Sequence, residues 1–377
     1  MTKFILSFSF LFWTGFSVKA QDAKTLFEEG VKLKDQKKSA AAAEKFKQAI
    51  QLKPGYTEAL YELGWCRNDG KDYKAAIEAL RQVMPAWSNV YKANFELGYA
   101  FEKTANRDSA LHYYKRCIEI NPENANVYKQ LGNMAYQNDE NEEALKNYLL
   151  YEGRVKVPIT DYLYWYRKGF LHNALKDYAS AKPSLLKSLE FKTDYINTYL
   201  ELGFSCSRLK EDEQAINYYK KAIELDPKSH IGYNGIGEVY RDNKKDRTMA
   251  MEWYRKTLAI NPSERKANFG IGYCLNSEGK YSEAIPYLKV AIEMETTYTA
   301  AYVELGYSYY RTGNITDAMY YLKEAMRLSP QNENSRYYMG LIYINQRDKT
   351  NAQRMVDELK LIGSKNAASL QERVNKM

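Results

Sequence analysis

The stretch VELGYSYYRTGNITDAMYYLKEAMRLSP, residues 303–330, contains the pattern on which the predicted fold rests. Its apolar residues follow the spacing of an amphipathic helix on both sides of the turn sequence RTGN. Gly306 nevertheless lies inside the first apolar run, where a glycine costs about 1 kcal/mol relative to alanine. Nearly the same pattern, LELGFSCSRLKEDEQAINYYKKAIELDP, occurs at residues 200–227. The sequence therefore predicts a repeated pair of helices.

A glycine recurs at the place of Gly306 in steps of 34 residues, with two exceptions. The step is 37 residues from Gly132 to Gly169 and 35 residues from Gly237 to Gly272. An alanine follows each glycine by twelve residues, and by thirteen after Gly237, where we place the extra residue in the interhelical loop. We expect glycine and alanine to face each other where the helices cross, because small residues let the helix axes approach closely. The glycines are Gly30, Gly64, Gly98, Gly132, Gly169, Gly203, Gly237, Gly272, Gly306 and Gly340.

Further positions of each unit also recur. In the unit that begins at Thr299, the large aromatic Tyr302 takes the fourth position, and Gly306 takes the eighth after a leucine. Ala318 takes the small position of the second helix, and Pro330 closes the unit. This pattern resembles the tetratricopeptide repeat, in about ten copies over residues 23–366. The resemblance implies an all-α fold, a right-handed α-solenoid superhelix of antiparallel helix pairs.

The resemblance and the irregular step after Gly132 together predict the domain organisation. Residues 1–20 are a cleaved signal peptide, 23–158 hold repeats 1–4, 159–161 are an insertion at an irregular junction, 162–366 hold repeats 5–10, and 367–377 are a tail or a short capping helix. Pro183 and Pro286 each fall two residues after the alanine of a second helix. We expect these two helices to start late or to kink, because proline lacks an N–H and clashes with the preceding turn.

The first twenty residues resemble a secretory signal. Lys3 supplies the positive start, residues 4–18 form a short apolar stretch, and Ala20 ends a small-residue cleavage site before Gln21. The apolar run is too short and too interrupted for a membrane anchor, which needs about 20 apolar residues. We therefore expect an exported protein of bacterial type, periplasmic or secreted. If the segment is retained, a cytoplasmic assembly factor is the alternative. No later stretch of the sequence approaches transmembrane length.

Composition and charge argue against several classes of function. The 55 Lys and Arg residues exceed the 47 Asp and Glu residues, but both signs are interspersed, so we expect no nucleic-acid partner. Four cysteines lie far apart in apolar helical contexts, which favours small buried hydrophobic residues over disulfides. These cysteines are Cys66, Cys117, Cys206 and Cys274.

No group of residues has a catalytic or metal-binding pattern. The three histidines, His112, His172 and His230, lie in different units and lack the spacing of metal ligands. The stretch GYNGIGEVY, residues 232–240, has the glycine order GxxGxG and falls inside a repeat helix rather than after a strand, so it is not a nucleotide-binding loop. We expect no enzyme activity, no metal and no cofactor.

The concave surface that the resemblance implies is lined by the first helix of each unit, and here it is rich in aromatic residues. Residues four apart share one helix face. Aromatics at the fifth position partly serve packing between units, so the ninth position is the more informative one. Large rigid rings suit an extended peptide, a partner helix or a stacked sugar. The candidate groove residues are Tyr61, Trp65, Phe95, Tyr99, Tyr166, Phe170, Phe204, Phe269, Tyr273, Tyr307, Tyr310 and Tyr337. The ninth-position residues among them are Trp65, Tyr99, Phe170, Phe204, Tyr273 and Tyr307.

The carboxylate clamp of chaperone-binding members of the family is not reproduced. Lys129 and Asn133 match its first part, but Arg167 stands where an asparagine is needed, and Asn197 and Glu201 stand where basic residues are needed. We therefore expect a non-catalytic scaffold that binds a protein or peptide partner along the groove. A glycan-binding module of the cell envelope that stacks sugars on the same rings is the alternative. The identity of the partner and the oligomeric state stay open.

Overall fold

The computed structural model describes residues 21–377, and the proposed signal peptide, residues 1–20, lies outside this part. Within residues 21–377 the chain is helical, with no strand, so the predicted all-α fold is confirmed. The chain divides into two compact units between Thr160 and Asp161. Each unit is described by itself.

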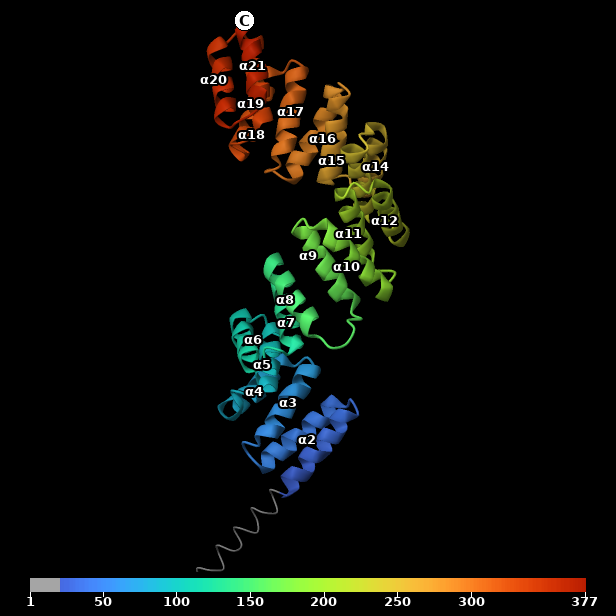
Figure 1. The fold of residues 1–377 in the computed structure, drawn as a ribbon, viewed down its shortest axis with the longest axis vertical. Helices are drawn as coiled ribbons and strands as arrows, with labels where there is room; N and C mark the ends of the chain where they lie inside the picture. The colour runs from blue at the N-terminus through green and yellow to red at the C-terminus, as the bar shows by residue number, and fades with distance from the viewer. Residues whose placement is uncertain (1–20) are drawn as a thin grey trace, which may run out of the picture. The chain divides into compact units, whose positions relative to one another are not determined.

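The first unit contains four helix pairs. Residues 21–35 are helical and precede α2, Ser39–Leu52. The helices that follow are α3 (Thr57–Asp69), α4 (Tyr73–Trp87), α5 (Tyr91–Lys103), α6 (Arg107–Ile120), α7 (Ala125–Gln137) and α8 (Asn141–Arg154). Successive helices pack side by side in chain order, and α3 also touches α5 (Figure 1). This is the pair-on-pair stacking of an α-solenoid. Residues 155–161, after α8, are not helical.

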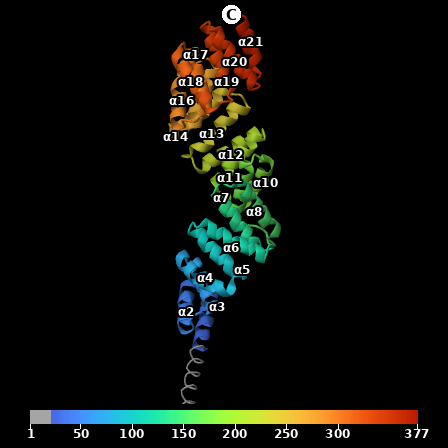
Figure 2. The ribbon, with the colours of Figure 1, turned by 90° about the vertical axis from the view of Figure 1, so that its left-hand side faces the viewer.

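The second unit repeats the same arrangement. Its helices are α9 (Tyr162–Ala174), α10 (Tyr178–Phe191), α11 (Ile196–Arg208), α12 (Asp212–Leu225), α13 (His230–Glu238), η1 (Val239–Asn243), α14 (Arg247–Ile260), α15 (Arg265–Ser277), α16 (Tyr281–Met294), α17 (Thr299–Arg311), α18 (Ile315–Leu328), α19 (Glu333–Asn345), α20 (Lys349–Leu361) and α21 (Asn366–Asn375). Odd-numbered helices from α9 to α19 are the first, or A, helices of their repeats, and each contacts the next A helix. Figure 2 shows the helices of this unit following one another in chain order. The last helix, α21, packs on α19 and α20.

The recurrent glycine faces a large side chain of the second helix, not the alanine that the sequence suggested. A Cβ built on Gly64 would lie 2.5 Å from Cγ of Leu80, and one on Gly132 would lie 2.5 Å from Cδ1 of Tyr148. Each partner is fully buried, so the glycine leaves space for a leucine, tyrosine or phenylalanine that fills the crossing. In the last repeat the side chain opposite the glycine comes from α21 and not from the second helix α20: Leu370 lies 2.4 Å from the Cβ position of Gly340.

The extra residue of the seventh repeat lies in its first helix and not in the loop where we placed it. After α13 the chain forms a turn of π-helix, η1. Lys244 N donates to Val239 O at 3.1 Å, a bond across five residues instead of four. An inserted residue that would shift the register of an α-helix is accommodated in this way, and such turns frequently mark functional positions.

The prolines do not delay the helices that contain them. Helix α10 begins at Tyr178, where the side chain of Asp177 accepts from the backbone N–H of Ser180. Helix α16 begins at Tyr281, so Pro183 and Pro286 both lie inside their helices. The expectation of a late start was wrong, because each helix completes its first turn before the proline is reached, in α10 with a side-chain cap from Asp177.

Candidate functional site: the aromatic groove

In the first unit, three predicted groove residues lie around one open pocket. Trp65, Phe95 and Tyr99 line this pocket of about 360 Å³ between α3 and α5. Tyr61 does not reach it: this side chain is buried, and its ring lies 5.5 Å from that of Trp87 on α4. The fifth-position tyrosine is therefore a packing residue, and the two ninth-position rings of this unit face the pocket.

At the start of the second unit, the predicted aromatics contact other rings, edge-on for Tyr166 and Phe204 and tilted for Phe170. Tyr166 is buried, and its ring centroid lies 5.0 Å from that of Tyr195. Phe170, half-buried, lies 6.4 Å from Tyr166. Phe204 is half-buried, and its ring lies 5.8 Å from Tyr178 at the start of α10.

Further along the second unit, the predicted residues divide into packed and accessible ones. Phe269 contacts Tyr298 at 4.9 Å, whereas Tyr273 is 38% exposed. Tyr307 stacks on Tyr338 at 4.5 Å. The remaining two are engaged by neighbours: Tyr310 accepts a hydrogen bond from Asn345, and Tyr337 lies 6.0 Å from Tyr338. The candidate groove residues of the second unit thus lie against neighbouring side chains, whereas three of those in the first unit line one pocket.

A polar contact between neighbouring A helices escaped the sequence analysis. Asn68, at the end of α3, donates from Nδ2 to the backbone oxygen of Glu96 at 2.9 Å and to its Oε2 at 2.8 Å. Asn173 makes the same two bonds to Glu201, at 3.1 and 2.7 Å. Asn276 makes them to Glu304, at 3.0 and 2.8 Å. The asparagines are buried, so each ties one A helix to the next.

A serine completes this contact in two of the three cases. Ser205 and Ser308 are fully buried and donate to the Oδ1 atoms of Asn173 and Asn276, both at 2.7 Å. In the first copy the corresponding residue is Ala100, which has no hydroxyl. Oδ1 of Asn68 is consequently buried without a hydrogen-bond partner in the part of the chain that the structure describes.

Next to each asparagine lies an edge-on pair of rings with a cation over it. The ring centroids of Tyr73 and Tyr99 are 6.1 Å apart, and the ammonium of Lys103 lies 4.9 Å from the Tyr99 ring. The second pair, Tyr178 with Phe204, has Arg208 at 5.3 Å from Phe204. The third pair, Tyr281 with Tyr307, has its rings 5.6 Å apart and Arg311 4.4 Å from Tyr281.

We call each set of asparagine, glutamate, two rings and cation an interface module. Module 1 is Asn68, Tyr73, Glu96, Tyr99 and Lys103. Module 2 is Asn173, Tyr178, Glu201, Phe204 and Arg208. Module 3 is Asn276, Tyr281, Glu304, Tyr307 and Arg311.

The interface modules recur every third repeat, between α3 and α5, α9 and α11, and α15 and α17. The sequence contains the signal: NDGKDY at 68–73, NALKDY at 173–178 and NSEGKY at 276–281 are each followed by ELGY or ELGF. A comparison of single repeats hides this longer period, because two of every three repeats lack the asparagine.

The module glutamates are carboxylates in a partly buried setting. Burial raises the pKa of Glu96, Glu201 and Glu304, and the hydrogen bond from the asparagine opposes this shift in each case. Among the ion pairs of residues 21–377, none involves these three glutamates. Each module therefore holds a partly buried glutamate whose direct partner is an asparagine amide; in module 1 the charge of the nearby Lys34 also lowers the pKa of Glu96.

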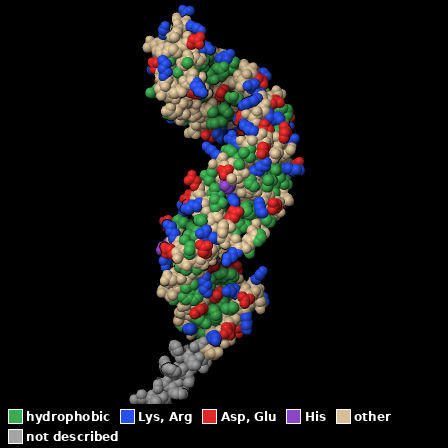
Figure 3. Space-filling view, viewed as in Figure 1, with side chains coloured by type: hydrophobic (Ala, Val, Ile, Leu, Met, Phe, Trp, Pro, Cys, Tyr) green, Lys and Arg blue, Asp and Glu red, His purple; other side chains and the backbone are tan. Residues whose placement is uncertain are grey.

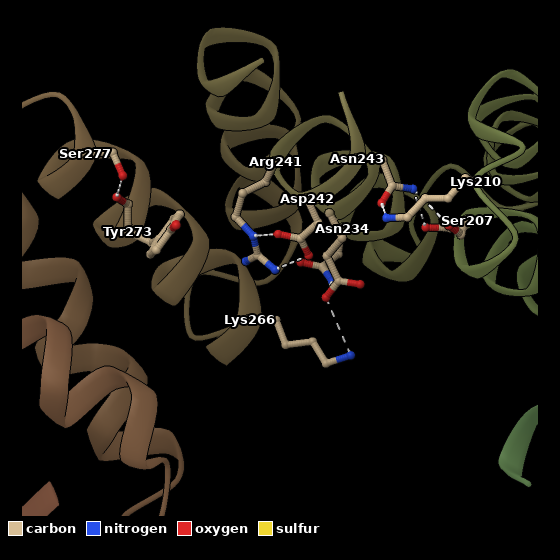
Figure 4. A network of polar contacts seen from close by, with 10 residues as sticks. Ser207, Lys210, Asn234, Arg241, Asp242, Asn243, Lys266, Tyr273 and Ser277 are labelled. Carbon is tan, nitrogen blue, oxygen red and sulfur yellow. Dashed lines mark hydrogen bonds and ion pairs between the residues drawn. The ribbon is translucent and has the colours of Figure 1, made fainter. Parts of the chain in front are cut away.

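The seventh repeat has a polar network of its own (Figure 4). Arg241, in η1, binds Asp242 through two hydrogen bonds at 2.6 and 2.7 Å, and its guanidinium lies 5.7 Å from the Phe269 ring. Glu238 accepts from Asn234 at 3.2 Å and pairs with Lys266 at 3.6 Å. Its charges are matched within the network. Figure 3 likewise shows acidic and basic side chains interspersed over the visible face.

The cysteines are buried and free, as the sequence predicted. Burial raises the pKa of Cys66 and Cys274 to about 11 and that of Cys117 and Cys206 to about 12, so the thiols stay protonated at neutral pH. Within residues 21–377, no cluster of metal-ligating side chains occurs, and no helix is long and apolar enough to span a membrane. His172 instead lies 3.2 Å from Asp177.

The stacked pairs and their inter-repeat contacts define a helical repeat protein. Models of the tetratricopeptide repeat match residues 33–86, 91–124, 162–195, 196–229, 232–264, 266–298 and 299–332, more than half of the chain. The chain belongs to the tetratricopeptide repeat family.

Individual relatives match only in part. Tetratricopeptide repeat protein 6 of Homo sapiens is 31% identical over 97 residues, which cover 25% of this chain and 19% of that protein. The Hsp70-Hsp90 organising protein of Plasmodium falciparum (isolate 3D7) is 27% identical over 172 residues, which cover 42% of this chain and 28% of that protein. The chain thus spans less than a third of either relative. A chain of the APC/C hetero-tetramer Cut9-Hcn1 is similar in structure, with a TM-score of 0.54 and 15% identity over 94% of this chain and 86% of that one, which shows the fold alone.

Proposed function

We propose that the chain is a non-catalytic scaffold that binds a peptide or protein partner along the groove of its A helices. The observation that carries this proposal is the pocket between α3 and α5, where Trp65, Phe95 and Tyr99 meet at one opening. Rings in such a position offer a partner a large contact area at little conformational cost. The exposed Tyr273 extends the same kind of surface within the second unit.

Membership of the family supports a protein partner, because tetratricopeptide repeats are interaction modules. The similarity to the Hsp70-Hsp90 organising protein does not extend to that protein's own partners. Arg167 and Glu201 stand where the carboxylate clamp needs an amide and a cation. The proposed ligand is therefore an internal stretch of polypeptide and not a free C-terminus.

We further propose that the protein acts in a bacterial cell envelope, as the resemblance of residues 1–20 to a secretory signal supports. Mass spectrometry of the protein from fractionated cells tests this proposal. The expected result is a mature chain that begins at Gln21 in the envelope fraction. A chain that keeps Met1 in the cytosolic fraction contradicts it and supports a cytoplasmic assembly factor.

Affinity capture from an envelope lysate tests the binding function. The variant with Trp65→Ser, Tyr99→Ser and Tyr273→Ser should recover about tenfold less of the partner, since it loses rings at the centre of the contact. Tyr320→Ser is the matched control, because Tyr320 is 58% exposed on α18 and outside the predicted row. Circular dichroism checks that all variants keep their helicity.

Unchanged capture by the triple variant contradicts the proposal and leaves the rings a packing role only. The same proteins are applied to an array of purified envelope glycans. Binding to a glycan that the triple variant loses, with no protein recovered, favours the glycan-binding alternative.

A further inference from the structure

The pocket between α3 and α5 has aromatic walls and is rich in hydrogen-bond acceptors. Trp65, Tyr73, Phe95 and Tyr99 supply four rings. The rest of the lining consists of Asn68, Asp69, Lys71, Glu96 and Gln130. The Nδ2 of Asn68 is already bound to Glu96, and one oxygen of Asp69, Oδ2, already accepts from Ser39. A ligand that fits must therefore donate hydrogen bonds and must also present a flat or apolar surface to the rings.

The charge of the pocket is negative. Two carboxylates, Asp69 and Glu96, face one ammonium, that of Lys71, which gives a net charge of −1 for the lining residues. Two other cations lie near the rings, Lys34 at 5.2 Å from the Trp65 ring and Lys103 at 4.9 Å from the Tyr99 ring, and each is paired with a carboxylate. Lys34 binds Glu62 at 2.6 Å, and Lys103 binds Glu102 at 2.5 Å. Oε2 of Glu96 accepts a hydrogen bond from Asn68, and Oε1 forms no ion pair within the described residues.

The other two interface modules show which group these rings accept. In module 3 the chain supplies a guanidinium of its own: Arg311 lies 4.4 Å from the Tyr281 ring and 5.7 Å from the Tyr307 ring. In module 2 Arg208 lies 5.3 Å from the Phe204 ring. Module 1 has a lysine at this position, and that lysine is held by Glu102. Of the three modules, only module 1 therefore lacks an arginine over its rings.

We propose that the pocket of module 1 binds an arginine side chain of the partner polypeptide. A guanidinium matches the site better than an ammonium, because its planar face stacks on rings while its N–H groups bind a carboxylate in pairs. Glu96 and Asp69 are the acceptors, and Trp65 and Tyr99 are the stacking surfaces. This proposal rests on the proposed function and names the group that the groove recognises in the first unit.

Surface plasmon resonance with the immobilised full mature chain tests the proposal. The probes are decapeptides of glycine and serine that contain one arginine, or one citrulline as its neutral isostere. The arginine peptide should bind at least tenfold more tightly than the citrulline peptide. Glu96→Gln should remove at least tenfold of the affinity for arginine, because the amide still accepts from Asn68 but carries no charge. Asp69→Asn should cause a smaller loss in the same direction.

Glu142→Gln is the matched control, since Glu142 is an exposed carboxylate at the start of α8 and lies outside the pocket. Its affinity for the arginine peptide should equal that of the parent. Equal binding of the two peptides, or an unchanged affinity of Glu96→Gln, overturns the proposal. If the triple ring variant loses partner capture while the peptides bind equally, the groove function stands and only the arginine site falls. If Glu96→Gln weakens arginine binding but the triple ring variant still captures the partner, the pocket binds an arginine peptide, the groove function falls, and the assignment of that arginine to the partner falls with it.

Discussion

At the scale of single residues, Asn68 differs from Asn173 and Asn276 in one hydrogen bond. Its Oδ1 is buried beside Ala100, where the other two copies have a serine. Ala100→Ser should therefore raise the free energy of unfolding by about 1 kcal/mol, the usual net value of a hydrogen bond. Ser308→Ala is the reciprocal change and should lower it by about 1–3 kcal/mol, since it leaves a buried acceptor unsatisfied. Urea unfolding measures both. A loss of stability in Ala100→Ser contradicts the assignment.

The recurrent glycine makes a second prediction at this scale. Gly132→Ala should destabilise the chain by about 1–3 kcal/mol, because the added methyl would overlap the ring of Tyr148. The control is Gly153→Ala in α8, where nothing lies within 4 Å of the new Cβ. Because alanine has a higher helix propensity than glycine, this variant should be more stable by about 0.5–1 kcal/mol. Thermal unfolding of the two variants should shift in opposite directions. Equal shifts would mean that the ring of Tyr148 moves aside.

The module glutamates predict a pH dependence of stability. Burial raises the pKa of Glu304, so the folded chain binds this proton more tightly than the unfolded chain does. Burying the ionised carboxylate therefore lowers the free energy of unfolding. This loss is absent when the pH is below the ordinary glutamate pKa of 4.5, and it is complete once the pH exceeds the raised pKa. Glu304→Gln, which can still accept from Asn276, should raise the unfolding midpoint at pH 7 and have no effect near pH 4. A midpoint gain that is the same at both pH values contradicts this cause.

At the scale of elements, the turn between the helices of every repeat requires a left-handed residue. Eight of these positions hold non-glycine residues: Lys37, Lys71, Ala105, Asp139, Lys176, Lys210, Lys245 and Arg347. Gly279 and Gly313 occupy the other two with φ of 78° and 86°. Residues other than glycine are strained in this conformation, which lowers the free energy of unfolding. The packing of the helix pairs offsets this loss.

Ala105→Gly tests this strain. Ala105 has φ of 58°, and the replacement should raise the free energy of unfolding by about 1 kcal/mol. Ala41→Gly, at an exposed position of α2, is the control and should lower it by about 0.5–1 kcal/mol. Guanidinium unfolding followed by circular dichroism distinguishes the two signs. A destabilised Ala105→Gly would show that the turn is not strained.

The same elements show how far sequence reasoning reaches. The helix pairs, the buried cysteines and the helical course of GYNGIGEVY follow from local periodicity, so they could be predicted. The residue opposite each glycine depends on how two helices cross, and the π-turn η1 depends on which element absorbs an insertion. The Asn68–Glu96 contact joins different repeats and recurs only every third one. Such features depend on tertiary packing, which single-repeat patterns do not encode.

At the scale of the whole molecule, each repeat contacts only its neighbours within its unit, so binding surfaces are set by which side chains the A helices carry. An exposed aromatic residue also occurs on a second helix of a repeat, Tyr320 on α18. We expect the A-helix rings, and not exposed rings in general, to contact the partner. That claim concerns contact and is separate from stability.

Site-specific photocrosslinking in living cells tests it most directly. A benzophenone amino acid is placed at Tyr99 in one variant and at Tyr320 in another, and crosslinked products are compared after irradiation. We expect a discrete crosslinked partner from position 99 and none from position 320. A partner that crosslinks from position 320 but not from position 99 would contradict it.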